Sequence, residues 1–257
     1  MKRGPLIAIE GIDGTGKGTQ AQLLTAALRE RGRAVELFSF PAYTTTLAGE
    51  LVAAYLNGAL GAPFSIDSRL TAVLFALDRF ELKGEIERAM ASGAVALCDR
   101  YVGSNLAHQV ARAPPRRKAA LRALIERLEH GVFALPRPEL VLYLDMPDAL
   151  AQQRVLKKAP RDYTRKQLDA HEADRTHLRA ALAEYRRQAR TRPGWALIRT
   201  VGPGGAERSR EEVHRDVLAA LEGAGVLAPR RRALTRQEPL VAIPPGSRGP
   251  RARRPSR

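Results

Sequence analysis

The sequence predicts an α/β fold with a parallel five-stranded sheet and helices on both faces. Three observations support this prediction. Short apolar runs alternate with longer segments whose apolar residues recur every three or four positions, as expected for strands that alternate with helices. A turn rich in glycine joins the first apolar run to the first helical segment. With 257 residues, the chain is long enough to bury one large core.

The elements follow in a regular order. We expect strands near residues 6–10, 34–39, 94–98, 139–145 and 196–201. Helical periodicity predicts helices near residues 16–31, 46–58, 66–91, 103–111, 116–130, 147–157, 166–191 and 208–222. Asp145 and Pro147 mark the change from the fourth strand to the next helix, because proline fits the first helical position, where no N–H is needed.

Charge and composition divide the chain. The formal net charge is +16, and residues 228–257, with nine Arg and one acidic residue, contribute +8 of it. This tail also holds six Pro and lacks apolar periodicity, so we expect residues 1–227 to form the folded domain and the tail to be disordered. An arm that binds nucleic acid is one interpretation of the tail, and a solvated basic extension is the interpretation that we favour.

Cysteine usage and apolar runs indicate the compartment. The single Cys98 rules out an internal disulfide and suits a reducing environment. No apolar run approaches the roughly 20 residues that span a bilayer, and the N-terminus lacks a signal-peptide core. We therefore expect a cytoplasmic protein with no membrane partner.

The glycine-rich turn has the features of a phosphate-binding loop. Three glycines let several backbone N–H groups point at one anion, the following helix adds its positive dipole end, and Lys17 adds a charge. An ordinary strand-to-helix turn is the alternative, but lysine at this spacing argues against it. We predict that ATP phosphates are bound by Gly11, Ile12, Asp13, Gly14, Thr15, Gly16, Lys17, Gly18 and Thr19.

One position departs from the common loop pattern. Gly18 follows the lysine, where a hydroxyl on magnesium is usual, and the hydroxyl comes one residue later, at Thr19. Nucleoside monophosphate kinases often carry this Gly-Lys-Gly-Thr-Gln sequence. The fold prediction is therefore a P-loop NTPase-type sheet with a small lid.

Polar residues follow the third predicted strand at the sheet edge where ligands bind in open α/β folds. Asp99 is a candidate ligand for Mg²⁺ or its waters, and Arg100 can bind an acceptor phosphate through two hydrogen bonds. A structural ion pair is the alternative for these two residues. One and two helical turns further on, polar groups for the base or sugar come from Ser104, Asn105, His108 and Gln109.

Two further segments carry candidate residues. Phe75 and Arg79 lie four apart on a helix and so share a face that could hold a flat heterocycle, although a core Phe and a surface Arg are the more common outcome of such spacing. Residues 154–166 predict a lid over the triphosphate, whose cations are Arg154, Lys158 and Arg161. A solvated helix end is the alternative for this segment.

Five motifs in order resemble the thymidylate kinase (dTMP kinase) family over residues 5–222. They are the loop at 11–17, Phe40-Pro41, Phe-Ala-Leu-Asp-Arg at 75–79, Asp-Arg-Tyr-Val-Gly-Ser-Asn at 99–105, and Asp-Ala-His-Glu-Ala-Asp at 169–174. The resemblance implies ATP-dependent phosphorylation of dTMP with Mg²⁺, a homodimer, and small-molecule nucleotides as the partners. Another nucleoside monophosphate kinase, acting on dUMP or a purine nucleotide, and a non-catalytic nucleotide-binding scaffold are the alternatives.

The resemblance also implies roles for individual residues. The predicted catalytic residues are Lys17, Asp13, Arg100, Arg154 and Arg161, and the predicted metal ligands are Asp13 and Asp99. Phe75 would stack on thymine, Arg79 would hydrogen-bond its carbonyl edge, and Arg100 would bind the acceptor phosphate. The remaining nucleotide contacts would come from Phe40, Ser104, Asn105 and His108, with Glu172 and Asp174 near the acceptor or its metal.

Two further departures concern the acceptor. Many family members have Arg after Phe-Pro, where this chain has Ala42, and losing a charged phosphate contact costs about 1.5–3 kcal/mol unless another cation replaces it. His108 stands where several members have Tyr beside the deoxyribose. Both positions bear on which acceptor the chain prefers.

Overall fold

A computed structural model describes residues 3–157 and 174–226 of the chain. Its sheet has five parallel strands in the order β2-β3-β1-β4-β5. The strands are β1 (Leu6–Glu10), β2 (Val35–Ser39), β3 (Val95–Asp99), β4 (Leu140–Asp145) and β5 (Trp195–Arg199). The predicted α/β class, with its parallel five-stranded sheet, is confirmed.

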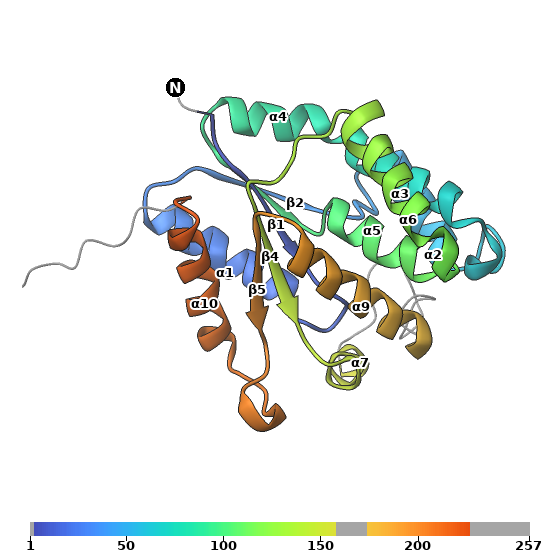
Figure 1. The fold of residues 1–257 in the computed structure, drawn as a ribbon. Helices are drawn as coiled ribbons and strands as arrows, with labels where there is room; N and C mark the ends of the chain where they lie inside the picture. Colours follow the sequence, from blue (N-terminus) through green and yellow to red (C-terminus); the bar gives the residue numbers. More distant parts are fainter. Residues whose placement is uncertain (1–2, 158–173, 227–257) are drawn as a thin grey trace, which may run out of the picture. The chain divides into compact units, whose positions relative to one another are not determined.

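Alternation along the central strand β1 explains why both faces of the sheet are covered. Ile7 and Ile9 pack on one face with α1 (Lys17–Glu30) and α10 (Arg210–Gly223). Leu6 and Ala8 pack on the other face, which α4 (Lys83–Ala91) and α5 (Val102–Ala111) cover. Figure 1 shows α1 and α10 on one side of the strands and α5 with α9 (Arg175–Thr191) on the other.

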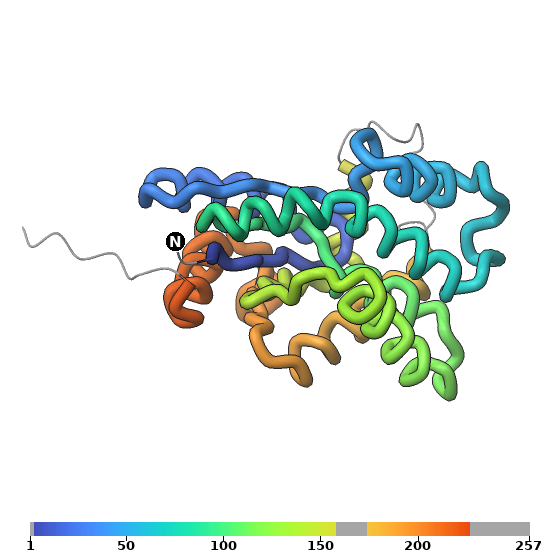
Figure 2. Tube along the Cα trace, turned by 90° about the horizontal axis from the view of Figure 1, so that it is seen from above, coloured from blue at the N-terminus to red at the C-terminus, as the bar shows by residue number. Residues whose placement is uncertain are grey.

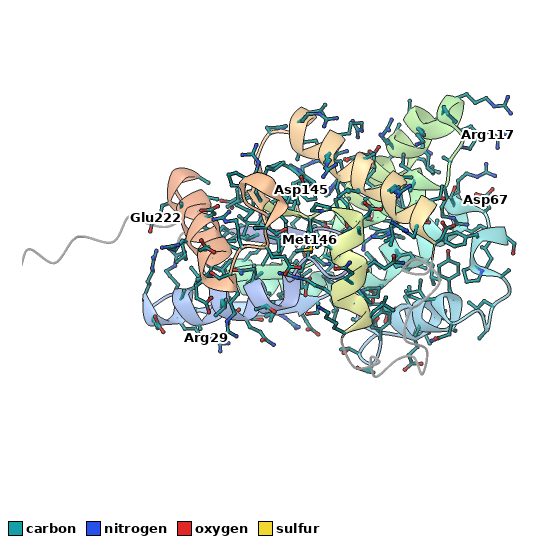
Figure 3. The ribbon with its side chains drawn as sticks, turned by 90° about the horizontal axis from the view of Figure 1, so that it is seen from below. Arg29, Asp67, Arg117, Asp145, Met146 and Glu222 are labelled. Atoms are coloured by element: carbon teal, nitrogen blue, oxygen red, sulfur yellow. The ribbon has the colours of Figure 1, made fainter. Side chains whose placement is uncertain are left out.

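The two helices of the first face are also tied to each other. Arg31, just after α1, forms an ion pair of 3.1 Å with Glu222 of α10, and Figure 3 labels Glu222 and Arg29 on these two neighbouring helices. The ion pair therefore fixes α10, near the end of the described residues, against α1.

The structure describes four further helices, of which the first projects past the carboxyl edge of the sheet and packs on the second; these two form the helical wall. The four helices are α2 (Leu47–Leu56), α3 (Ser68–Glu81), α6 (Pro115–Glu126) and α7 (Asp148–Leu156), with short turns η1 (Pro63–Ser65), η2 (Arg127–Val132) and η3 (Pro203–Gly205). Figure 2 shows the segment from the end of β2 through α2 projecting past this edge of the sheet. In the described residues no helix is long and apolar enough to cross a membrane.

The expected single helix over 66–91 is wrong. The chain forms α3 and α4, which are separated at Leu82, a buried residue with φ −93° and ψ 3° that caps both helices. The break lets α3 pack on α2 and α5, while α4 packs on β2 and β3. The expected helix over 116–130 is α6 followed by the wider π-type turn η2, and the fifth strand ends at Arg199 instead of residue 201.

The parallel sheet gathers the last residues of its strands at one edge. Glu10, Ser39, Asp99 and Asp145 end β1, β2, β3 and β4. The loop after β1 and the helix after β3 start from this edge, so the topology brings together the segments that carry the sequence motifs.

Candidate active site

The loop between β1 and α1 has the conformation of a phosphate cradle. Gly14 and Gly16 have φ of 86° and 94°, which glycine adopts without strain. A Cβ at Gly14 would lie 2.1 Å from the carbonyl oxygen of Ala151, so a larger residue does not fit there. Because no side chain caps the start of α1, its first N–H groups can bind an anion.

Lys17 lies over this loop. Its Nζ donates to the carbonyl oxygen of Ile12 at 2.9 Å and lies 3.9 Å from Oδ1 of Asp13. Thr15 donates its hydroxyl hydrogen to the same carbonyl, also at 2.9 Å, and so closes the loop. The side chain of Thr19 is exposed on the first turn of α1.

Two adjoining cavities meet at Asp13 and Arg100. The first cavity runs between the loop edge and the helical wall, and its lining comprises Asp13, Phe40, Pro41, Tyr43, Leu56, Phe75, Arg79, Arg100, Ser104, Asn105, His108 and Gln109. The second cavity, of about 320 Å³, opens on the loop and is lined by Asp13, Gly14, Gly16, Lys17, Gly18, Ser39, Phe40, Pro41, Tyr43, Asp99, Arg100 and Val155. If each cavity held a ligand, the two ligands would meet beside the shared residues Asp13 and Arg100.

Arg100 is held at this junction from several sides. Its backbone has φ of 67°, an uncommon conformation for a residue with a side chain, which tends to mark functional sites. Nη2 lies 2.7 Å from Oδ2 of Asp13, and Nη1 donates to the carbonyl oxygen of Gly11 at 3.1 Å. Burial opposes the charge, but Asp13, Tyr185, Asp99 and Glu10 together outweigh it, and the pKa of Arg100 lies well above its ordinary value.

Glu10 lies fully buried beneath Arg100. Its Oε1 accepts the backbone N–H groups of Tyr101 at 2.9 Å and Ser104 at 3.0 Å. Its Oε2 accepts the hydroxyl of Ser104 at 2.6 Å and that of Tyr185 at 3.3 Å. Burial raises the pKa of Glu10, although these hydrogen bonds and the charge of Arg100 act in the opposite direction.

The far end of the first cavity is built on a buried ion pair. Arg79 and Glu129 form two hydrogen bonds, one of 3.0 Å from Nε to Oε2, and both residues are almost fully buried. Asn105 donates its Nδ2 hydrogens to Oε1 of Glu129 at 2.7 Å and to the carbonyl oxygen of Ala72 at 2.9 Å. Arg79 therefore lines the cavity, with Nε and Nη2 both bonded to Glu129.

Two polar atoms at this end remain unused. Gln109 is fixed through Oε1, which accepts from Thr71 at 2.7 Å and from Arg112 at 3.1 Å. In the described part of the chain, Oδ1 of Asn105 and Nε2 of Gln109 are buried without a hydrogen-bond partner. Because a buried unsatisfied polar group is costly, this pair indicates a place for a ligand.

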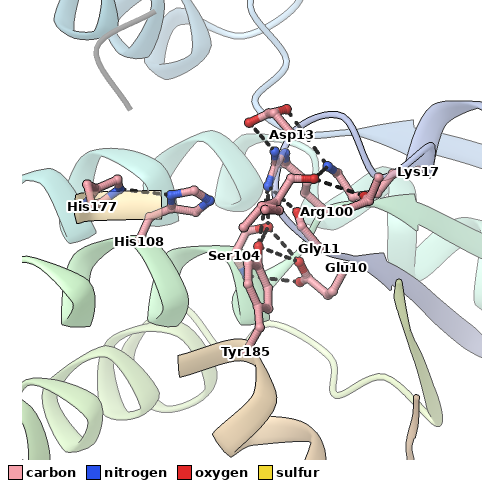
Figure 4. Close-up of polar contacts among 11 residues, drawn as sticks. Glu10, Gly11, Asp13, Lys17, Arg100, Ser104, His108, His177 and Tyr185 are labelled. Atoms are coloured by element: carbon pink, nitrogen blue, oxygen red, sulfur yellow. Dashed lines mark hydrogen bonds and ion pairs between the residues drawn. The ribbon is translucent and has the colours of Figure 1, made fainter. Parts of the chain in front are cut away.

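Rings surround the middle of the first cavity. Phe75 packs its edge against Tyr55, with ring centroids 6.3 Å apart, and Phe40 lies 6.2 Å from Tyr101. His108 lies near His177 of α9, with Nδ1 and Nε2 3.2 Å apart (Figure 4). The cavity thus has aromatic walls between its two polar ends.

Ala42 does not leave a gap in this wall. It is buried, and its backbone N–H donates to the carboxylate of Asp78 at 3.1 and 3.2 Å. In the described residues, Arg79 and Arg100 are the arginines that line the first cavity. The residues beside Ala42 that line this cavity, Phe40, Pro41 and Tyr43, therefore carry no positive charge that could take the place of the arginine found in relatives.

The two predicted metal ligands, Asp13 and Asp99, both line the second cavity. A Cβ at Gly18 would lie 3.4 Å from Oδ2 of Asp99, so the small residue leaves room beside this carboxylate. The described residues contain no group of three His, Cys, Asp or Glu side chains able to hold a metal ion. This arrangement fits a magnesium ion that arrives with nucleotide phosphates and keeps several waters.

Other predicted residues lie elsewhere. Arg154 does not line either cavity, because its guanidinium binds Glu207 at 2.7 Å. Asp174 caps α9 by accepting the N–H groups of Thr176 and His177. Most of the predicted lid, Lys158 and Arg161 included, lies outside the described residues, as do Glu172 and the tail 228–257.

Several residues at the site were not singled out from the sequence. Glu10 directly precedes the loop and ends a strand at the ligand edge, which is a signal that could have marked it. Glu129, His177 and Tyr185 come from η2 and α9, far along the chain from the motifs, and no local pattern indicates their contacts.

A parallel sheet with a glycine-rich, lysine-containing loop after its central strand, and a second cavity adjoining that loop, defines the class of P-loop kinases of small molecules. Comparison with known proteins narrows the class. The model of the family described as thymidylate kinase matches residues 9–192. The chain belongs to the thymidylate kinase family.

Individual relatives agree with this assignment. A thymidylate kinase of Mycobacterium tuberculosis (strain ATCC 25618 / H37Rv) is 36% identical over 157 residues, covering 61% of this chain and 73% of the relative. A probable thymidylate kinase of Pyrococcus abyssi is 32% identical over 222 residues, covering 86% and 97%. The solved structure of thymidylate kinase from Candida albicans covers 87% of this chain and 93% of its own, with a TM-score of 0.66 and 23% identity, and shows the shared fold.

Proposed function

We propose that this chain transfers the γ-phosphoryl group of ATP to dTMP and so makes dTDP and ADP. The observation that carries this proposal is the pair of unused atoms at the end of the first cavity, Oδ1 of Asn105 and Nε2 of Gln109. One is an acceptor and the other a donor, and both are fixed by hydrogen bonds from their second amide atom.

This donor and acceptor suit a thymine ring. Thymine presents N3–H between two carbonyl oxygens, so N3–H can donate to Oδ1 of Asn105 while a carbonyl accepts from Nε2 of Gln109. Cytosine has an acceptor at N3, which would face the acceptor Oδ1 of Asn105, and an amino group at C4, which would face the donor Nε2 of Gln109 if that atom binds the C4 side of the ring. Uracil presents the same edge as thymine, so the choice of dTMP over dUMP rests on family membership.

The polar junction suits phosphoryl transfer. With the base near Asn105, the acceptor phosphate would reach Arg100, and the donor phosphates would occupy the loop with Lys17 beside them. The reaction then needs positioning and charge neutralisation, which the loop N–H groups and these two cations supply. The acceptor phosphate oxygen attacks the γ-phosphorus in line, and ADP leaves.

Magnesium is the metal that this proposal includes. Asp99 and Asp13 would hold it, directly or through water. Bound with the nucleotide, it would neutralise charge that develops on the transferring group.

An acceptor panel tests the proposal. ADP release is measured with ATP, Mg²⁺ and each of dTMP, dUMP, UMP, CMP, AMP and GMP. We expect the highest kcat/KM with dTMP, weaker turnover with dUMP, and the lowest values with the other bases. Preference for a purine nucleotide, or no turnover with any acceptor despite ATP binding, would contradict the proposal.

The same proposal extends to a homodimer, as in the family resemblance. Exposed apolar side chains form a stripe along one face of α3, namely Leu70, Val73, Leu77 and Phe80, and α2 adds Leu47 and Leu51. A stripe of this kind at helical spacing is a common dimer surface.

Placing a charge in this stripe tests the dimer. Leu70→Glu is expected to shift the particle mass measured by light scattering from two chains to one, because the carboxylate would be buried unpaired. Leu197→Glu, at an exposed position on β5, is the matched control. A dimer that persists in Leu70→Glu, or one-chain mass in the unmodified protein, would contradict this surface.

Other parts of the expected organisation stay proposals. A cytoplasmic location rests on the single cysteine, Cys98, which is a buried free thiol. The closing role of the lid segment 154–166 requires Arg154 to leave Glu207. We retain the division into a kinase domain over 1–227 and a basic tail.

A further inference from the structure

We propose that Glu10 is a positioning residue for the acceptor phosphate: through the hydroxyls of Ser104 and Tyr185 it fixes Arg100 so that Nη2 faces the junction of the two cavities. This inference rests on the proposed function, because it concerns the arginine assigned there to the phosphate. Figure 4 shows the four residues in one connected network.

The two terminal nitrogens of Arg100 have different surroundings. Nη1 lies among three protein oxygens, the carbonyl of Gly11 at 3.1 Å, Oγ of Ser104 at 3.2 Å and the hydroxyl of Tyr185 at 3.4 Å. Nη2 contacts Oδ2 of Asp13 at 2.7 Å, at the border of both cavities. Nη1 is therefore the anchored nitrogen, and Nη2 is the one that an incoming phosphate can take over from Asp13.

The anchoring depends on where the hydroxyl hydrogens point. Ser104 and Tyr185 can accept from Nη1 only if their own hydrogens are directed elsewhere. Oε2 of Glu10 lies 2.6 Å from Oγ of Ser104 and 3.3 Å from the hydroxyl of Tyr185, which lie 2.7 Å from each other. Because an ionised carboxylate only accepts, it draws these hydrogens to itself and leaves the oxygen lone pairs for Arg100.

Glu10 also holds the segment from which Arg100 projects. Its second oxygen accepts the backbone N–H groups of Tyr101 and Ser104, directly after the left-handed residue Arg100 and at the start of α5. One buried carboxylate thus supports both the backbone turn and the guanidinium. All residues of the network lie within the described part of the chain. The network holds Nη1 of Arg100 and leaves Nη2 for the phosphate.

Glu10→Gln separates positioning from a purely structural role. The glutamine is nearly the same size, and its carbonyl oxygen can still accept from the two backbone N–H groups. Its amide nitrogen must then face the two hydroxyls, which turns their hydrogens toward Arg100 and repels the guanidinium. We expect KM for dTMP to rise by about tenfold to a hundredfold, as for the loss of a charge-assisted hydrogen bond, while KM for ATP changes little.

Two further variants serve this test. Glu184→Gln removes another buried carboxylate, one that pairs with Arg122 and Arg187 and lies outside both cavities, and is expected to leave both KM values unchanged. Tyr185→Phe removes a single hydroxyl of the network and is expected to raise KM for dTMP by a smaller factor. If Glu10→Gln does not fold, the KM for dTMP of Tyr185→Phe alone tests the inference.

Several outcomes would overturn the inference. These are an unchanged KM for dTMP in both Glu10→Gln and Tyr185→Phe, an equal rise in both KM values, or the same rise in Glu184→Gln. A crystal structure of Glu10→Gln gives a readout that needs no turnover: Nη1 of Arg100 should have left the hydroxyls of Ser104 and Tyr185. An unmoved guanidinium overturns this inference, whereas wild-type protein that fails to phosphorylate dTMP overturns the proposed function.

Discussion

Lys17→Ala is expected to lower kcat for dTMP phosphorylation by about 10²-fold to 10³-fold, as the loss of a fixed group that stabilises transition-state charge does. Lys17 lies over the phosphate loop, and its Nζ is within 2.9 Å of the carbonyl oxygen of Ile12. Charge accumulates on the oxygens of the transferring group, and without Lys17 only the loop N–H groups and Arg100 of the proposed set would balance it.

Steady-state ADP release at saturating dTMP measures this change. Because Nζ donates to the carbonyl of Ile12 in the loop and lies beside Asp13, away from the hydrophobic core, we expect the variant to keep its circular-dichroism spectrum and thermal midpoint close to those of the wild type. Lys83→Ala, which removes a half-buried lysine paired with Glu87 at 3.8 Å outside both cavities, is the matched control and should retain full activity. Turnover of Lys17→Ala within a factor of a few of the control would exclude this role.

Glu129→Ala is expected to have the largest effect on stability, about 3–5 kcal/mol less free energy of unfolding, because it leaves the buried guanidinium of Arg79 without its partner. Glu129 is fully buried, accepts from Arg79 on both oxygens and also accepts from Asn105. Burial disfavours the charge of Arg79, and Glu129, with smaller contributions from Asp78 and Tyr101, raises the pKa of Arg79 above its ordinary value.

Urea unfolding followed by circular dichroism measures the loss. Glu87→Ala removes an exposed partner of Lys83 and should cost at most about 1 kcal/mol. Replacing both members of the buried pair, as in Arg79→Met with Glu129→Leu, should restore much of the stability but not the activity, since Asn105 loses its anchor. A free energy of unfolding for Glu129→Ala equal to that of Glu87→Ala would refute this account of the cavity end.

The sequence predicted the parts of this molecule that depend on local patterns. Short apolar runs and the glycine-rich turn identify the sheet and its loop, because both are properties of a few consecutive residues. The break at Leu82 was missed, since apolar periodicity continues through it and the bend is set by packing of α4 on the sheet.

Contacts between distant segments could not be predicted in the same way. Arg79 was expected at the base edge from its position beside Phe75, but its ion pair depends on Glu129, fifty positions away in η2. Glu10 and Tyr185 meet Arg100 only because β1, β3 and α9 converge at one edge. Side-chain partners chosen by tertiary packing leave no periodic signal in one sequence.

The measurement that tests the central claim most directly compares wild-type kcat/KM for dUMP and dCMP beside dTMP. These two acceptors share sugar and phosphate and differ only at the base edge that would face Asn105 and Gln109. We predict that dTMP is best and that dUMP exceeds dCMP by about 10²-fold or more, because dCMP leaves buried polar atoms unpaired. Equal values for dUMP and dCMP would contradict base recognition by these two residues, and a higher value for dCMP than for dTMP would contradict the proposed function itself.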